Sequence, residues 1–460
     1  MSAEGTFVFF PDLSACRIVF QFGADSASAK LVVHRRYKQK SHYVQARSVS
    51  EPDKPTIIMI AYHFPPGEEI GGRRPFRLRK YLQRMGYKCH VITADEPAPD
   101  APDDVIYVPD HLRRRWEGTT RGRLSWKGLI ELLIRASLFP GKLGFVWSVD
   151  AAARCRQLIR AYPQRRFVIF STYPPHGVLL AGLWVRLRER LPWVCDFRDP
   201  IADPPGLASR LTRLSNTLLE RSSFRAATAV IANTEGAASV WRTRYPWAQS
   251  KLHVIWNGFD PEEAPKPEAR PAGEQKLIVH AGELHVGRNP NLILESLSRL
   301  NAQERPEAKA VTILQVGQIS PDSRLDSELA AKAQREGRLK LLPPVPKSEA
   351  QRMMLEADGL LLLQPNTTIQ IPGKLFEYIC IGRPILALTP RHSAVEWVLA
   401  QSGVPYVCIC SDDAPEVIDA KLVEFLRLPS TPVPYSDWYR NNFNAEHQAQ
   451  QLAAIVESIE

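Results

Sequence analysis

Short apolar runs alternate with longer amphipathic stretches along most of the chain, and this alternation predicts its architecture. The first set of apolar runs covers residues 56–62, 88–94, 166–172, 193–197, 227–233 and 251–256. Segments of helical length separate these runs. Strands that are apolar throughout are typical of a parallel sheet covered on both faces, so the pattern predicts a doubly wound α/β domain.

A segment rich in proline, glutamate and alanine then interrupts the pattern, and residues 259–275 are predicted to be a linker. The alternation resumes in apolar runs at 276–282, 310–317, 339–345, 359–365 and 384–390. We expect the parts of the chain to be a poorly defined extension (1–54), a Rossmann-like domain (55–258), the linker, a second Rossmann-like domain (276–434) and a helical tail (435–460). Two such domains facing one another predict a ligand in the crevice between them, at the carboxyl ends of the strands.

Charge is distributed unevenly between the two halves. Residues 51–260 hold 32 basic and 20 acidic side chains, a net charge of +12, whereas residues 261–460 have a net charge of −6. The asymmetry indicates that the first half faces something anionic: a phospholipid surface, a phosphorylated substrate or nucleic acid. Seven cysteines without any CxxC pair favour a reducing compartment, so we expect a cytoplasmic protein.

The stretch IPGKLFEY, which follows an apolar run, contains the first candidate site. A helix is expected to begin near Gly373, where free backbone amides favour phosphate. Lys374 would lie in that first turn, where a cation is unfavourable unless an anion is bound. Glu377 would share its face and suits a ribose diol. A solvent-exposed Lys–Glu pair explains the same spacing equally well.

A second candidate follows the run at 276–282. Arg288 stands between a strand end and a helix expected near Asn289-Pro290, from where its guanidinium could reach a diphosphate. An ordinary exposed loop arginine is the alternative. Both candidate loops lie at the carboxyl ends of strands in one sheet, which strengthens the joint interpretation.

The first half offers candidates for the acceptor side. Asp196 in VCDFRDP is placed to orient an acceptor hydroxyl or to act as its base, and Arg198 and Asp199 either join it or lock the loop. His176 and His63 also follow strand ends, although a lone histidine is more often part of the scaffold. We find no cluster with convincing metal-ligand spacing, and we predict no required metal or other cofactor.

A series of motifs resembles a known family. AYHFPPGEEIGGRRPF, STYPPHGVLLAG, VCDFRDP, ATAVIANTEG, VIWNGFD, HAGELHVGRNP and IPGKLFEYICIGRPILAL occur in the order shown by the family 4 retaining glycosyltransferases of GT-B fold. The resemblance covers about residues 55–430. No single motif is very specific, but seven in register are hard to reach by chance.

This resemblance implies roles for the candidates. Arg288 and Lys374 would neutralise the diphosphate of a nucleotide sugar, Glu377 would hold its ribose, and the glycines at 71 and 72 would let the backbone approach the phosphates. Two departures concern the donor end. Gln370 stands where the family usually has an acid that contacts the sugar, and Glu283 replaces the arginine of the usual Gly-Arg pair. Both resemble a PGKLFEY-type subgroup associated with envelope polysaccharides.

The expected activity is therefore metal-independent transfer of a sugar, with retention, to a lipid-linked or polysaccharide acceptor. The alternatives are a nucleotide-sugar epimerase or hydrolase of the same fold, and a basic nucleic-acid-binding protein. Residues 111–147 mix basic side chains with tryptophan and suit an anionic membrane surface, which would place the protein at the inner face of the cell membrane. A solvated loop and a packed helix fit the same segment.

Overall fold

The structure is a computed structural model that describes residues 54–67, 71–96, 98, 100–111, 113, 144–202, 210–265 and 275–459, and the backbone alone of 16–22, 29–35 and 70. The chain divides into two compact units, Met1–Lys54 and Pro55–Glu460. Most of residues 111–147, predicted to meet a membrane, and residues 266–274 of the predicted linker lie outside the described residues.

The first unit contains a strand pair that the sequence analysis did not predict. Strands β1 (Cys16–Phe22) and β2 (Ala29–Arg35) pair antiparallel, with Cys16 opposite Arg35 and Phe22 opposite Ala29. Both sequences are rich in the β-branched and aromatic residues that favour strands.

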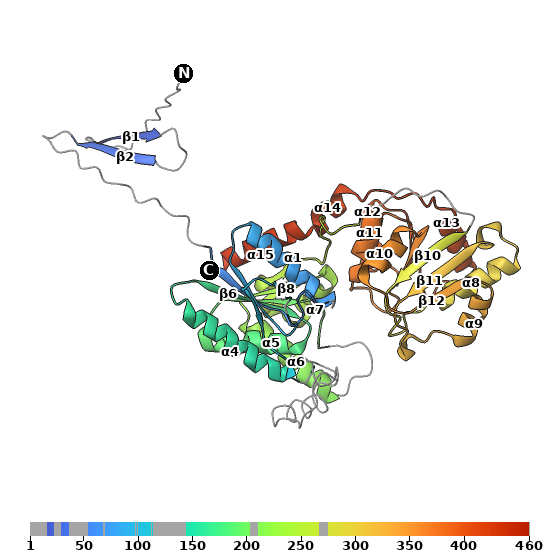
Figure 1. The fold of residues 1–460 in the computed structure, drawn as a ribbon, viewed down its shortest axis with the longest axis horizontal. Coiled ribbons are helices and arrows are strands. Elements are labelled where there is room, and N and C mark those ends of the chain that lie inside the picture. The colour runs from blue at the N-terminus through green and yellow to red at the C-terminus, as the bar shows by residue number, and fades with distance from the viewer. Residues whose placement is uncertain are drawn as a thin grey trace, which may run out of the picture. The chain divides into compact units, whose positions relative to one another are not determined.

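The second unit begins with the parallel sheet that contains β6 and β8 in Figure 1. Its described strands follow the order β5-β4-β3-β6-β7-β8-β9. These are β3 (Thr56–Ile60), β4 (Cys89–Thr93), β5 (Val105–Tyr107), β6 (Phe167–Tyr173), β7 (Trp193–Phe197), β8 (Ala229–Ala232) and β9 (Leu252–Val254). Its helices are α1 (Arg73–Arg84), α4 (Phe145–Ala161), α5 (His176–Glu189), α6 (Arg210–Ala226) and α7 (Glu235–Arg244). The strand order reverses between β3 and β6, as in a doubly wound fold.

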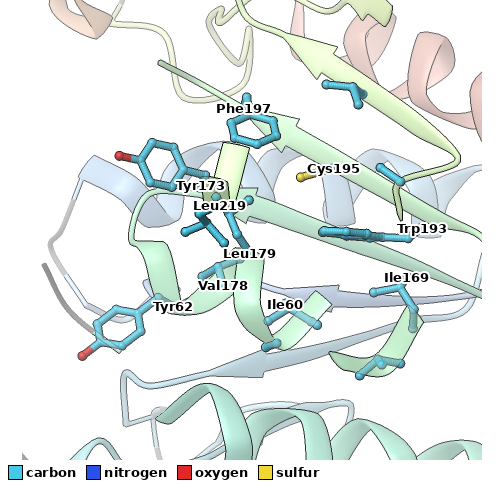
Figure 2. Close-up of a cluster of buried hydrophobic side chains, with 14 of the residues drawn as sticks. Ile60, Tyr62, Ile169, Tyr173, Val178, Leu179, Trp193, Cys195, Phe197 and Leu219 are labelled. Carbon is cyan, nitrogen blue, oxygen red and sulfur yellow. The ribbon is translucent and has the colours of Figure 1, made fainter. Parts of the chain in front are cut away.

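Alternate residues of these strands serve two hydrophobic cores. Ile58 and Ile60 of β3 point into the core beneath α4 and α5, and Ile57 and Met59 point into the core beneath α1. Figure 2 shows the first of these cores around Trp193, whose indole Nε1 donates to Ser171 Oγ at 2.8 Å. The continuous apolar runs in the sequence reflect this burial on both faces.

The second parallel sheet follows the order β12-β11-β10-β13-β14-β15 among the described residues. Its strands are β10 (Lys276–Ala281), β11 (Val311–Val316), β12 (Leu339–Leu342), β13 (Gly359–Leu363), β14 (Ile385–Leu388) and β15 (Tyr406–Ile409). The helices of this half are α8 (Asn291–Ala302), α9 (Ser327–Arg335), α10 (Lys347–Leu355), α11 (Gly373–Ile381), α12 (Ala394–Ser402), α13 (Pro415–Arg427), α14 (Asp437–Phe443) and α15 (Ala445–Ser458). Short 3₁₀ turns are formed by Ile70–Gly72, Pro246–Lys251, Pro306–Ala308 and Pro321–Ser323. The order reverses between β10 and β13.

The two ends of the second half return to the first sheet. Phe259, at the start of the predicted linker, stacks on Tyr439 of α14 with ring centroids 5.1 Å apart. The next residue, Asp260, accepts hydrogen bonds from Lys80 and Tyr81 of α1 at 2.7 and 2.8 Å. Helix α15 packs on α1 and completes the core on that face of the first sheet (Figure 1). The first residues of the predicted linker are therefore fixed, and the tail belongs to both domains.

The structure confirms the predicted fold class of two Rossmann-like parallel sheets, and a strand begins within each of the eleven apolar runs. Helices also begin close to the expected positions, since α8 starts at Asn291 and α11 at Gly373. The sequence analysis missed β5 and β15, which have three and four residues and lie at sheet edges. Among the described helices, none is long and apolar enough to cross a membrane.

Candidate functional site

Most of the candidate residues gather at the points where the strand order reverses, and Asp196, Arg198 and Asp199 lie at the end of the neighbouring strand β7. In the second sheet, the loop after β10 carries Arg288 and the loop after β13 leads into Lys374 at the start of α11. In the first sheet, the loop after β3 carries the Gly-Gly pair and the loop after β6 leads into α5. Ligands of doubly wound folds bind outside the carboxyl ends of strands at such points.

The loop after β10 brings its backbone unusually close to the end of a lysine. Gly282 has a φ of +146°, and a Cβ at this position would lie 2.1 Å from Lys374 Nζ. Lys374 itself occupies the first turn of α11, where Pro372 is the N-cap residue and no acidic residue is present. The ammonium group thus lies directly over the strand end, in the turn where a bound anion would meet free backbone amides.

Two buried side chains hold the Lys374 ammonium group in this position. Its Nζ lies 3.3 Å from His280 Nε2, and His280 Nδ1 lies 2.6 Å from Gln315 Oε1. Gln315 Nε2 in turn donates to the Gly282 carbonyl at 2.7 Å. Because an ammonium group can only donate, His280 Nε2 must accept and its Nδ1 must carry the proton.

The electrostatics agree with this direction of the hydrogen bonds. Burial lowers the pKa of His280 well below its ordinary value, and the Lys374 charge acts in the same direction, so the imidazole is neutral at neutral pH. Burial also lowers the pKa of Lys374 from 10.5 to about 8, with a further contribution from Arg288. The lysine is therefore charged at pH 7 but held in an unfavourable environment.

Arg288 is the second cation of the site. It is partly buried, and its Nη1 lies 3.2 Å from His285 Nε2. Burial lowers its pKa, and the carboxylate of Asp199 opposes that shift. Neither Arg288 nor Lys374 forms an ion pair with another described residue within 4.0 Å, so both charges remain available to an anion.

Glu377 lies one turn beyond Lys374 on α11. Its Oε1 accepts from Gln351 Nε2 at 3.2 Å and lies 4.0 Å from Nη1 of Arg73 at the start of α1. The carboxylate is therefore placed between the second domain and the helix that follows the Gly-Gly turn of the first.

Gln370 joins the two domains directly. Its Nε2 donates to Asp199 Oδ1 at 2.7 Å, from the loop after β13 to the loop after β7. Beside this contact, a Cβ on Gly236 of α7 would lie 2.7 Å from the Cβ of Ile369. The residue that replaces the expected acid thus makes an interdomain hydrogen bond.

The remaining candidates on the first domain surround the Gly-Gly turn. Arg198 donates to the Tyr173 carbonyl at 2.7 Å and to the Gly71 carbonyl at 3.2 Å, which ties three loops together. His63 Nδ1 lies 3.3 Å from Asp95 Oδ2, and its ring would lie 3.2 Å from a Cβ on Gly71. The neighbouring Gly72 would place a Cβ 3.0 Å from the Phe64 backbone, so both glycines allow the turn to pack closely.

Asp196 and His176 make structural contacts. Arg74 donates to both carboxylate oxygens of Asp196 at 2.9 Å, Thr172 Oγ1 donates at 2.7 Å, and the carboxylate is completely buried. His176 is also buried, with Nε2 2.9 Å from Asn216 Oδ1. These contacts give the predicted base roles of Asp196 and His176 no geometric support.

One group of described residues has donor atoms close enough for a metal: Cys410, Asp412 and Asp413. Asp413 already accepts from Arg391 and Lys421, and these cations compensate its charge. The group therefore has a structural explanation, and the expectation of metal-independent chemistry stays a prediction.

Comparisons with known proteins show which sequences and structures this chain is similar to. Residues 71–263 match Glycosyltransferase Family 4. The D-inositol 3-phosphate glycosyltransferase of Jonesia denitrificans is 23% identical over 260 residues, which span 50% of this chain and 56% of that protein.

Solved structures show the same fold. HepE of Anabaena in complex with UDP and glucose has a TM-score of 0.53 at 15% identity, covering 88% of this chain and 100% of its own. Sucrose-phosphate synthase of Thermosynechococcus elongatus has a TM-score of 0.57 at 14% identity, covering 88% and 99%. A UDP-forming trehalose-phosphate synthase of Burkholderia xenovorans also has a TM-score of 0.57, at 11% identity with the same coverage.

The fold is therefore GT-B, as the sequence predicted. Residues 71–263, less than half of the chain, match glycosyltransferase family 4, and this match agrees with the expected class of enzyme.

Sequence reasoning missed the residues that support the cations. His280 and Gln315 are register partners on the adjacent strands β10 and β11. The available signal was a polar residue near the carboxyl end of each of two mainly apolar runs. Arg74, which neutralises Asp196, could not be distinguished by sequence from the other basic residues of α1.

Proposed function

We propose that the protein transfers a sugar from a nucleoside-diphosphate sugar to an acceptor hydroxyl group. The observation that carries this proposal is the pair of unneutralised cations, Arg288 and Lys374, at the strand-order reversal of a GT-B fold. Two fixed positive charges beside free amides at a helix N-terminus suit a diphosphate.

In this proposal the protein acts mainly through electrostatics. As the bond between sugar and diphosphate breaks, negative charge develops on the departing phosphate, and Lys374 and Arg288 stabilise it. The His280–Gln315 hydrogen bonds keep the ammonium group in place, so no reorganisation is needed during the reaction. Glu377 lies on the same helix at a spacing that suits the ribose hydroxyls.

The finer points of the proposal are retention at the anomeric carbon, independence of metal, and a lipid-linked or polysaccharide acceptor. Family resemblance supports all three. The subgroup associated with envelope polysaccharides remains part of the same proposal, since the PGKLFEY sequence carries it. On the sugar side, Gln370 and Asp199 together offer an amide and a carboxylate to the donor.

Two alternatives are less well supported. An epimerase or hydrolase would share the nucleotide site but would need paired acid and base groups, whereas Asp196 and His176 are engaged in structural contacts. Nucleic-acid binding was suggested by the basic first half. Several cations of α1 are already paired with acidic side chains of the same chain.

The test begins with thermal unfolding in the presence of UDP-, GDP-, ADP- and dTDP-sugars. A ligand at 100 times its dissociation constant should add about 2.7 kcal/mol of stability. The stabilising donor is then incubated with lipid and glycan acceptors, and product is compared with sugar released to water. Stabilisation by none of the nucleotide sugars would refute the proposal, and release to water that no acceptor suppresses would favour the hydrolase.

A further inference from the structure

Helix α6 has an apolar stripe on the side that faces away from its own core. Leu211, Leu214 and Leu218 are 48%, 56% and 56% exposed. Their spacing of three and four residues places all three on one side of the helix. The opposite side is buried, with Leu219 and Phe224 in the core beneath the sheet. An amphipathic surface helix needs only one apolar side for its own domain, so the second side requires another explanation.

Basic residues accompany this stripe. Arg210, Arg221 and Arg225 are exposed and, by helical periodicity, lie beside the three leucines. Glu220, the acidic residue in the sequence of α6, is buried and accepts from the side chains of Arg244 and Tyr245. The outward side of α6 therefore presents leucine and arginine without any acidic side chain.

Neighbouring elements extend the same chemistry. Trp247 is 48% exposed and has two cations near its ring, with Arg225 Cζ 5.9 Å and Lys251 Nζ 5.8 Å from the ring centroid. On α5, Trp184 is 46% exposed and carries Arg188 Cζ 5.7 Å above its ring. Helices α5 and α6 are adjacent, because Arg186 Nε donates to the Ala226 carbonyl at 3.1 Å.

We propose that this α6 face, formed by Leu211, Leu214, Leu218, Arg210, Arg221 and Arg225, docks on an anionic phospholipid bilayer. Leucine side chains would enter the boundary between headgroups and acyl chains, while the arginines meet lipid phosphates and the tryptophans lie at headgroup depth. From Leu211 to Arg225 the helix is about 21 Å long at about 1.5 Å per residue, enough to lie along the interface. The inference does not depend on the transfer reaction, and it places the contact on residues other than 111–147.

The charge favours a membrane over another occupant. A second copy of the chain would bring the same arginines against one another across an isologous contact, which like-charge repulsion opposes. A bilayer containing anionic lipid instead offers a negative surface that matches the cations and an apolar layer that matches the leucines.

The experiment is flotation of the full chain with two kinds of vesicle. One is phosphatidylcholine alone, and the other contains roughly 30% phosphatidylglycerol, which makes its surface anionic. The wild type should float with the anionic vesicles and remain behind with the neutral ones. Combined replacement Arg210→Gln, Arg221→Gln and Arg225→Gln should lower the partition coefficient about 100-fold, at about fivefold per arginine. Combined replacement of the three leucines by serine should lower it by at least about tenfold.

The matched control removes three exposed cations from the second domain, by Lys332→Gln, Arg335→Gln and Lys340→Gln, and should float like the wild type. All variants are first checked for unchanged thermal unfolding, since none of the changed side chains is buried. Equal loss of flotation in the control would show a general charge effect and overturn the assignment to α6. Flotation that is retained in the serine variant would overturn the assignment as well. So would a dimer in solution that dissociates only when these leucines are replaced.

Discussion

Replacing Lys374 by methionine should stabilise the protein without ligand and abolish its response to nucleotide. The lysine is charged at pH 7, although its surroundings lower its pKa from 10.5 to about 8. At about 1.4 kcal/mol per pKa unit, holding this charge costs the free protein about 3 kcal/mol. Methionine keeps most of the aliphatic stem and removes the charge, while the lost hydrogen bond to His280 offsets about 1 kcal/mol. We expect a net gain of about 2 kcal/mol.

The pH dependence of this gain provides an internal check. The folded pKa of Lys374 lies below the unfolded value, so between about pH 8 and 10.5 the unfolded chain binds more protons than the folded one. The destabilisation is therefore complete below about pH 8 and is lost as the pH rises toward 10.5. The stability difference between the methionine variant and the wild type should shrink across the same range.

Nucleotide binding and sugar transfer should both weaken in the methionine variant, although its stability increases. Without the ammonium group, the stabilisation by nucleoside diphosphate should fall, and transfer should slow by about 10²-fold or more, equivalent to about 2.7 kcal/mol of transition-state stabilisation. Denaturant unfolding at several pH values, thermal shift with the best nucleotide and a transfer assay measure the three quantities. A variant that is less stable than the wild type at pH 7 and still responds fully to nucleotide would refute the reasoning.

Three further predictions concern the same region. Nucleoside-diphosphate affinity, measured by calorimetry, should fall as the pH rises through about 8, because the anion binds the protonated Lys374 better, and Lys374→Arg should remove this dependence. Gly282→Ala should weaken nucleotide binding by at least about tenfold, since its Cβ would displace the ammonium group. The control Gly337→Ala also places an alanine at a positive φ, here +71°, where its Cβ would have no atom within 4 Å, and should cost about 1 kcal/mol of stability while leaving binding intact. Gln370→Glu should lower transfer by setting two carboxylates against each other across the domains, and adding Asp199→Asn should recover part of the loss; no recovery would exclude this contact as the cause.

Much of the fold could be predicted because burial on both faces leaves a strong pattern. A strand such as β13, with all five residues buried, appears as an uninterrupted apolar run. The edge strands β5 and β15 escaped prediction because both are short and only partly buried, whereas β9, which is equally short, lies in a longer run that reaches Trp256. The folding of the tail onto α1 also escaped prediction, since an amphipathic helix does not specify which domain it covers.

The sequence predicted which loops form the candidate site, but it did not predict the contacts between their side chains. Parallel strands carry their carboxyl ends to one edge, which is why Arg288 and Lys374 could be grouped from sequence order. The support of Lys374 by His280 and Gln315 depends on the register of β10 against β11, which no short motif contains. The Gln370–Asp199 hydrogen bond depends further on how two domains meet.

The basic excess of residues 51–260 illustrates why charge counts alone do not identify a partner. Arg77, Lys80 and Arg84 project from one side of α1, and they pair with Glu262, Glu263 and Asp260 at the start of the linker. These cations hold the second domain to the first and are not available to an outside anion. The arginines of the outward α6 face have no acidic side chain beside them within that helix. Some of the basic residues behind the net charge of +12 are thus paired within the chain, and others lie on an exposed surface. Only the exposed ones can determine which partner the protein binds.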